Sequence, residues 1–97
     1  MKNISKNDFD KVTGDKGALV EFYADWCGEC SAMLPYLEEA EKQAAIPFYR
    51  FDCDSGREFA MSLGVMGLPT VIFYKNGKET ARKTGLLQTD EILALIK

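Results

Sequence analysis

The chain has 97 residues and a mass of 10.9 kDa, which predicts a single domain over residues 1–97. Hydrophobic residues make up 46% and charged residues 28%, as in a folded globular protein, and the lack of histidine excludes Ser-His and Cys-His catalytic pairs. Twelve Lys and Arg against fifteen Asp and Glu give a net charge of −3, so we expect no binding to nucleic acid or to a membrane surface.

The first half of the chain predicts two strands and two helices. Residues 2–4 are expected to form a short leading strand, and residues 5–13 a helix that Ser5 can cap. Residues 18–23 are an apolar run of strand length with a single charge inside it. Residues 30–45 repeat apolar side chains at spacings of three and four, which is typical of a helix.

The second half predicts three strands and two helices, over residues 47–53 (strand), 57–63 (helix), 70–74 (strand), 79–84 (strand) and from 89 onward (helix). Asn76-Gly77 predicts a type I′ hairpin between the last two strands. Strands separated by helices imply parallel pairing, and the hairpin adds an antiparallel strand. We therefore expect the α/β class: a central mixed sheet of four to five strands, flanked by helices on both faces.

Neither a targeting segment nor a membrane span is visible. The first residues lack the apolar run of a signal peptide, and no stretch approaches the ~18 apolar residues of a membrane helix. We expect a cytoplasmic protein, in a compartment that keeps thiols reduced.

The sequence Trp26-Cys27-Gly28-Glu29-Cys30 follows a predicted strand and opens a helix. The unpaired amides and the dipole of a helix N-terminus stabilise a thiolate at Cys27, which makes it a nucleophile. Cys30 lies one turn along, within disulfide reach, and can resolve a mixed disulfide. A C-x-x-C pair can also be half of a zinc site or two buried small residues. Because three cysteines cannot supply four thiolates and no histidine is present, we favour redox chemistry and expect no metal and no cofactor.

These residues resemble the thioredoxin family, and the match runs nearly end to end. It rests on the run from Val20 to Cys30, on Pro35 inside the following helix, on Gly67-Leu68-Pro69-Thr70, on Lys75-Asn76-Gly77-Lys78 and on Gly85. The resemblance implies a thioredoxin fold, reduction of disulfides in protein substrates, and re-reduction by an NADPH-dependent thioredoxin reductase. We also expect a monomer.

The resemblance also assigns roles to single residues. Cys27 matches the exposed nucleophile and Cys30 the buried resolving thiol of the family. Pro69 matches a cis-proline that faces the disulfide, although the residues alone favour an ordinary trans-proline at the start of a strand. The flat apolar docking patch would then comprise Trp26, Gly28, Gly67, Leu68, Thr84, Gly85 and Leu86.

Four positions depart from the family pattern. Glu29 replaces a usual proline, and Ser31 replaces a usual lysine. Glu21 stands where the family commonly has a buried aspartate, and Arg50 matches a lysine near it. Glu21 either faces an accessible sheet edge or is buried with a raised pKa, and in the second case it is the natural base for Cys30. An arginine partner would lower the pKa of Glu21 and weaken that role.

Two further features are interpreted as structural rather than catalytic. Cys53 ends a predicted strand on the same face as Phe51, which favours a buried thiol that simply packs, with a regulatory or dimer-forming thiol as the alternative. The cations of the hairpin are expected to form a solvated face that also protects an edge strand; they are Lys75, Lys78, Arg82 and Lys83.

The sequence thus predicts a protein-disulfide reductase that cycles between the Cys27–Cys30 dithiol and disulfide. A disulfide oxidase or isomerase with the same fold is the rival enzyme. From a different class, the fold can serve as a binding module that holds a partner protein without turnover.

Overall fold

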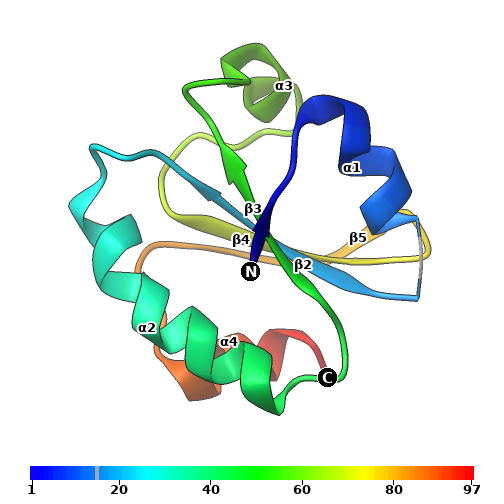
Figure 1. Ribbon diagram of the computed structural model, residues 1–97, viewed down its shortest axis with the longest axis vertical. Helices are drawn as coiled ribbons and strands as arrows, with labels where there is room; N and C mark the ends of the chain where they lie inside the picture. Colours follow the sequence, from blue (N-terminus) through cyan, green and yellow to red (C-terminus); the bar gives the residue numbers. More distant parts are fainter. Residues whose placement is uncertain (15) are drawn as a thin grey trace.

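The computed structural model describes residues 1–14 and 16–97. Five strands form one mixed sheet, with helices on both of its faces (Figure 1). In chain order the elements are β1 (Lys2–Asn3), α1 (Lys6–Thr13), β2 (Ala18–Tyr23), α2 (Gly28–Gln43), β3 (Phe48–Asp52), α3 (Arg57–Ser62), β4 (Thr70–Lys75), β5 (Lys78–Thr84) and α4 (Thr89–Leu95). The predicted α/β class and the flanking of the sheet by helices are confirmed.

The strand order across the sheet is β1-β3-β2-β4-β5. The pairs β1–β3 and β2–β3 are parallel, whereas β2–β4 and β4–β5 are antiparallel. The expected parallel pairing of the strand over residues 70–74 is therefore wrong. β4 runs opposite to β1, β2 and β3, and the hairpin returns β5 to their direction. α3 has six residues and spans about 9 Å, too little to carry the chain back along β3. The chain enters β4 at the end of the sheet where it left β3.

The two faces of the sheet have separate hydrophobic cores. One core packs Phe9 of α1 and Ala60 of α3 against Phe22 and Ile72 of the sheet. The other core packs α2 and α4 against the opposite sides of β2, β3 and β4. Figure 1 shows this division, with α2 and α4 together below the sheet and α1 and α3 above it. Because side chains alternate along a strand, successive residues of β2 belong to different cores.

The boundaries of the helices differ slightly from the expected ones. Ser5 is the N-cap residue of α1, but its side chain caps no backbone amide; its hydroxyl instead donates to Asp8 Oδ2 at 3.2 Å. α2 starts at Gly28, two residues earlier than expected, because Cys27 is its N-cap.

Asn76 and Gly77 have φ values of 54° and 80°, as the expected type I′ turn requires. Within the described residues, no helix is long and apolar enough to cross a membrane.

Candidate active site

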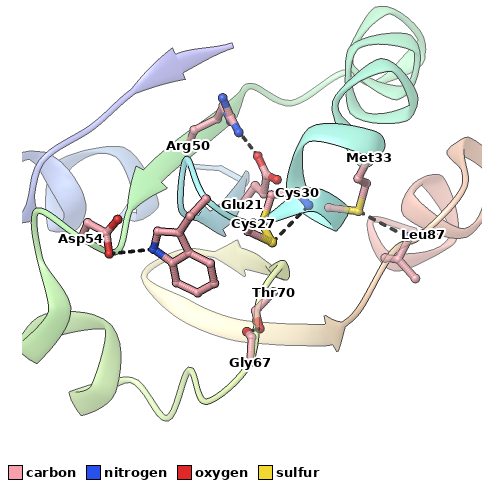
Figure 2. The surroundings of a disulfide bond; sticks show 10 residues. Glu21, Cys27, Cys30, Met33, Arg50, Asp54, Gly67, Thr70 and Leu87 are labelled. Carbon is pink, nitrogen blue, oxygen red and sulfur yellow. Dashed lines mark hydrogen bonds and ion pairs between the residues drawn. A yellow bond between two sulfur atoms is a disulfide. The ribbon is translucent and has the colours of Figure 1, made fainter.

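Cys27 and Cys30 form a disulfide at the N-terminus of α2 (Figure 2). Their Cα atoms are 5.3 Å apart. The backbone amide of Cys30 donates to Cys27 Sγ at 3.2 Å, so the sulfur occupies the position of a helix-capping acceptor. A negative charge on this sulfur would be stabilised by the same amide and by the positive end of the helix dipole.

The two cysteines differ in their access to solvent. Cys27 is 7% exposed and Cys30 is 1% exposed. Cys27 is therefore the more exposed of the two cysteines, as expected, although both are buried. Cys27 lies on the wall of an open cavity of about 340 Å³, and Cys30 does not. An incoming substrate sulfur can therefore reach Cys27 first.

This cavity brings together four of the expected site residues, Trp26, Cys27, Gly67 and Leu68. Trp26 is 72% exposed and donates from Nε1 to Asp54 Oδ1 at 3.2 Å. The cavity also has residues that the sequence analysis missed, including Met61, which is 59% exposed, and Met66, which is 87% exposed. The sequence signal for Met66 was its position directly before Gly67-Leu68-Pro69.

The Leu68–Pro69 peptide bond is cis, as expected. Leu68 packs against the cluster that contains both cysteines. The carbonyl of Pro69 accepts from the amide of Gly85 at 2.8 Å, which joins the start of β4 to the end of β5. The hydroxyls of Thr70 and Thr84 lie 3.0 Å apart across the same two strands.

Gly28 and Leu86, like Pro69, Thr84 and Gly85, are not among the residues that line the cavity. Leu86 is 39% exposed. A Cβ added to Gly28 would meet nothing within 4 Å, so the first residue of α2 is open.

Glu21 is fully buried, which decides between the two alternatives that the sequence left open. It lies on the face of β2 that α2 covers, like its neighbours Leu19 and Tyr23. Its Oε1 accepts from Arg50 Nε at 2.7 Å, whereas Oε2 is buried without a hydrogen-bond partner among the described residues. Figure 2 shows the carboxyl group between Arg50 and the two cysteines.

Burial raises the pKa of Glu21, and the hydrogen bond and charge of Arg50 act in the opposite direction. The expected lowering by arginine is thus real but smaller than the desolvation of the carboxylate. Arg50 is itself held in place: its guanidinium lies 3.6 Å from the centroid of the Tyr23 ring, and the Tyr23 hydroxyl accepts from Asn3 Nδ2 at 2.8 Å.

Cys53 is a free thiol just beyond the end of β3. It packs on the Phe51 side of the sheet as expected, but it is half-buried rather than buried, because it also contributes to the wall of the cavity. Burial raises the pKa of the Cys53 thiol to about 11, and the charges of Asp52 and Asp54 add to this rise. Cys53 is therefore protonated at neutral pH.

The comparisons with known proteins agree with this site. A family model described as thioredoxin matches residues 1–97. Thioredoxin-2 of Saccharomyces cerevisiae is 40% identical over 86 residues, which cover 88% of this chain and 83% of the yeast protein. The thioredoxin of Mycoplasmoides gallisepticum is 33% identical, with 100% of both chains covered.

Solved structures give the same result. A mutant thioredoxin from Halobacterium salinarum superposes with a TM-score of 0.89 at 29% identity, covering 98% of this chain and 88% of that one. The thioredoxin of Fasciola hepatica gives a TM-score of 0.87 at 30% identity, with 100% of both chains covered. The chain belongs to the thioredoxin family. It is a thiol–disulfide oxidoreductase with the active-site sequence Trp26-Cys27-Gly28-Glu29-Cys30.

Proposed function

We propose that the chain reduces disulfides in protein substrates, with Cys27 as the nucleophile and Cys30 as the resolving thiol. The observation that carries this proposal is the pairing of the Cys30 amide with Cys27 Sγ at 3.2 Å, on the one cysteine of the pair that reaches the cavity. A thiolate at that sulfur is both stabilised and accessible.

The reaction runs in two exchanges. The Cys27 thiolate attacks one sulfur of a substrate disulfide, forms a mixed disulfide with it, and releases the other sulfur as a thiolate. Cys30 then loses its proton and attacks Cys27 Sγ. The Cys27–Cys30 disulfide forms, the second substrate sulfur leaves, and two electrons have passed from the protein to the substrate.

Glu21 is the proposed acceptor of the Cys30 proton, directly or through water. Two observations support this role: its carboxyl group is buried on the α2 side of β2, and its Oε2 has no hydrogen-bond partner among residues 1–14 and 16–97. A carboxylate with a raised pKa is a stronger base than an ordinary glutamate, which is what abstraction of a thiol proton requires.

The substrate segment is proposed to lie across the cavity beside the disulfide. Trp26 and Leu68 would contact it with apolar surface, and the backbone around Leu68 and Pro69 would pair with it as an added strand. The rest of the docking patch would comprise Gly28, Gly67, Thr84, Gly85 and Leu86.

Thioredoxin-family membership implies disulfide-containing substrates and usually a reductase partner. We further propose that this partner is an NADPH-dependent thioredoxin reductase and that the protein acts in the cytoplasm as a monomer, with residues 1–97 as one domain. A compartment that keeps thiols reduced suits a protein that starts its cycle as a dithiol.

The direction of electron flow separates reduction from the rival oxidase or isomerase activity. The equilibrium of the Cys27–Cys30 pair with glutathione gives the reduction potential. We expect a value near the −270 mV that is typical of thioredoxins, whereas a value well above about −230 mV would favour oxidation or isomerisation.

Reduction of insulin disulfides with dithiothreitol as the electron source tests the roles of the cysteines. Cys27→Ser should abolish the reaction, because no nucleophile remains to attack. Cys30→Ser should instead accumulate a mixed disulfide between Cys27 and insulin, visible on a non-reducing gel. Turnover by Cys27→Ser would contradict the proposed roles, and binding of insulin by the wild type without turnover would favour the binding module.

A further inference from the structure

Residues 63–68, here called the docking loop, connect α3 to β4 and form one wall of the cavity beside Cys27. The loop starts as the C-terminal end of α3. The amide of Val65 donates to the carbonyl of Ala60 at 3.1 Å, and Gly64 has a φ of 76°, which together end the helix in the usual left-handed turn. Helix ends leave carbonyl groups that need donors from elsewhere.

Arg82 of β5 supplies these donors. Its Nη2 donates to the carbonyl of Leu63 at 2.7 Å, and its Nη1 donates to the carbonyl of Gly64 at 3.1 Å. The same guanidinium forms a two-point ion pair with Glu79, with Nε–Oε2 and Nη2–Oε1 distances of 2.8 and 2.7 Å. The hydrogen bonds from Arg82 lower the pKa of Glu79, so this carboxylate stays charged.

The expectation that Arg82 belongs to a solvated face is therefore wrong. Its side chain is 28% exposed, because β5 carries it on the face of the sheet that also holds α3. A lysine could not replace these bonds, since one ammonium group cannot span two carbonyls and a carboxylate in a fixed plane.

Thr70 of β4 and Thr84 of β5 together hold the other end of the docking loop. The hydroxyl of Thr70 donates to the carbonyl of Gly67 at 2.6 Å and lies 3.0 Å from the hydroxyl of Thr84. A Cβ added to Gly67 would stand 3.1 Å from Thr84 Cγ2, so this part of the loop already lies tightly against β5. Arg82 makes the corresponding contacts at the end of the docking loop that lies next to α3.

We propose that Arg82, oriented by Glu79, is a positioning residue for protein substrates, because it fixes the docking loop in the arrangement that receives the substrate chain. The proposal rests on the proposed function, in which substrate docks beside Leu68. Arg82 does not touch the disulfide, and its effect is expected on docking and not on the thiol chemistry. Without the Arg82 side chain, the docking loop would have its substrate-binding conformation in only a fraction of the molecules.

The test compares a large and a small disulfide. Pre-reduced protein is mixed with excess insulin or with cystamine, and oxidation is followed by the fluorescence of Trp26, the one tryptophan of the sequence. Arg82→Ala removes the two hydrogen bonds from the charged guanidinium to the docking loop. We therefore expect its second-order rate constant with insulin to be about tenfold lower than that of the wild type. Cystamine is too small to contact the docking loop, so its rate constant should change by less than about twofold in the same variant.

Matched variants separate positioning from general damage. Arg82→Lys keeps the charge and should recover only part of the insulin rate, and Glu79→Gln should lose a smaller part. Lys78→Gln removes one exposed cation from the same strand and should react like wild type. The pH dependence of the cystamine rate should be the same in all four variants, because none of the substituted side chains lines the cavity beside Cys27.

Amide hydrogen exchange measures the loop without any substrate. The amide of Val65 should exchange faster in Arg82→Ala than in Lys78→Gln, because the turn that protects it has lost its hydrogen bonds to Arg82. An unchanged insulin rate, an equal loss with insulin and cystamine, or unchanged exchange at Val65 would each overturn the proposal. A wild type that reduces neither disulfide would contradict the proposed function instead, and the exchange comparison would still decide the role of Arg82.

Discussion

At the scale of single residues, the position between Gly28 and Cys30 sets the charge beside the attacking sulfur. Glu29 lies in the first turn of α2 and is exposed. Its carboxylate suits the positive end of the helix dipole. A thiolate at Cys27 would occupy the same end of the helix, so the two negative charges oppose each other.

Glu29→Gln is expected to lower the pKa of Cys27, because it removes a negative charge and keeps the size of the side chain. In partly solvated surroundings, removal of this charge from the first turn of α2 should raise the thiolate fraction below the pKa about three- to tenfold. Thiolate absorbance during a pH titration of the reduced protein measures the change. Glu38→Gln, farther along α2, serves as the control. An unchanged or higher pKa in Glu29→Gln would refute the expected repulsion.

Residue identities predicted the reacting sulfurs better than they predicted the groups around them. The redox pair Cys27–Cys30 follows from local sequence, whereas the cis bond before Pro69 follows from the family resemblance alone. The state of Glu21 did not, because its burial depends on β2 lying inside the sheet between β3 and β4. Cys53 was expected to be buried and is half-buried, because the cavity beside it is made partly by the docking loop.

At the scale of elements, the start of α3 is fixed by a close approach between backbone and core. A Cβ added to Gly56 would lie 2.5 Å from Cζ and 2.8 Å from Cε1 of Phe51. Phe51 is 2% exposed and contacts the rings of Phe22 and Phe59. The ring therefore cannot move aside without disturbing the core on that side of the sheet.

Gly56→Ala is expected to reduce the free energy of unfolding by about 1–3 kcal/mol, which is the usual cost of overpacking a core. Urea unfolding, followed by circular dichroism, measures it. Gly28→Ala is the matched control, because nothing lies within 4 Å of its added Cβ. That variant should be neutral or slightly more stable, since alanine favours a helix. Equal stability of the two variants would show that Phe51 yields easily.

Element types were predictable from periodicity, but their relations in space were not. A strand over residues 70–74 was expected and β4 covers Thr70–Lys75, yet its direction depends on the short length of α3. Arg82 lies on an edge strand, where a charged residue ordinarily faces solvent. Nothing in the spacing of residues along β5 indicates that the end of α3 lies within reach of this guanidinium. Such contacts join segments that are distant in sequence, so they depend on the assembled fold.

At the scale of the whole molecule, the buried carboxyl group of Glu21 couples folding to pH. Burial raises its pKa above the usual 4.5, so the folded protein keeps this proton to a higher pH than the unfolded chain does. Between these two pKa values the folded state binds more protons than the unfolded state. The contribution of Glu21 to the free energy of unfolding therefore falls as the pH rises through this window, and it is constant below and above it.

Glu21→Gln should remove this dependence, because the amide does not titrate. The stability of the wild type relative to Glu21→Gln is expected to be greatest below the usual pKa of 4.5 and to fall over the pH range above it. Urea unfolding of both proteins across that range measures the difference at each pH. Glu38→Gln, an exposed change on α2, should follow the wild-type curve.

The partner of Glu21 provides an independent check of the sign. Because Arg50 lowers the pKa of Glu21 through its hydrogen bond and charge, Arg50→Leu should move the upper end of the pH window to higher values. A relative stability that rises with pH would mean that Arg50 outweighs burial and that Glu21 is ionised throughout. In that case the carboxylate would be too weak a base to take the proton of Cys30, and water would have to accept it instead.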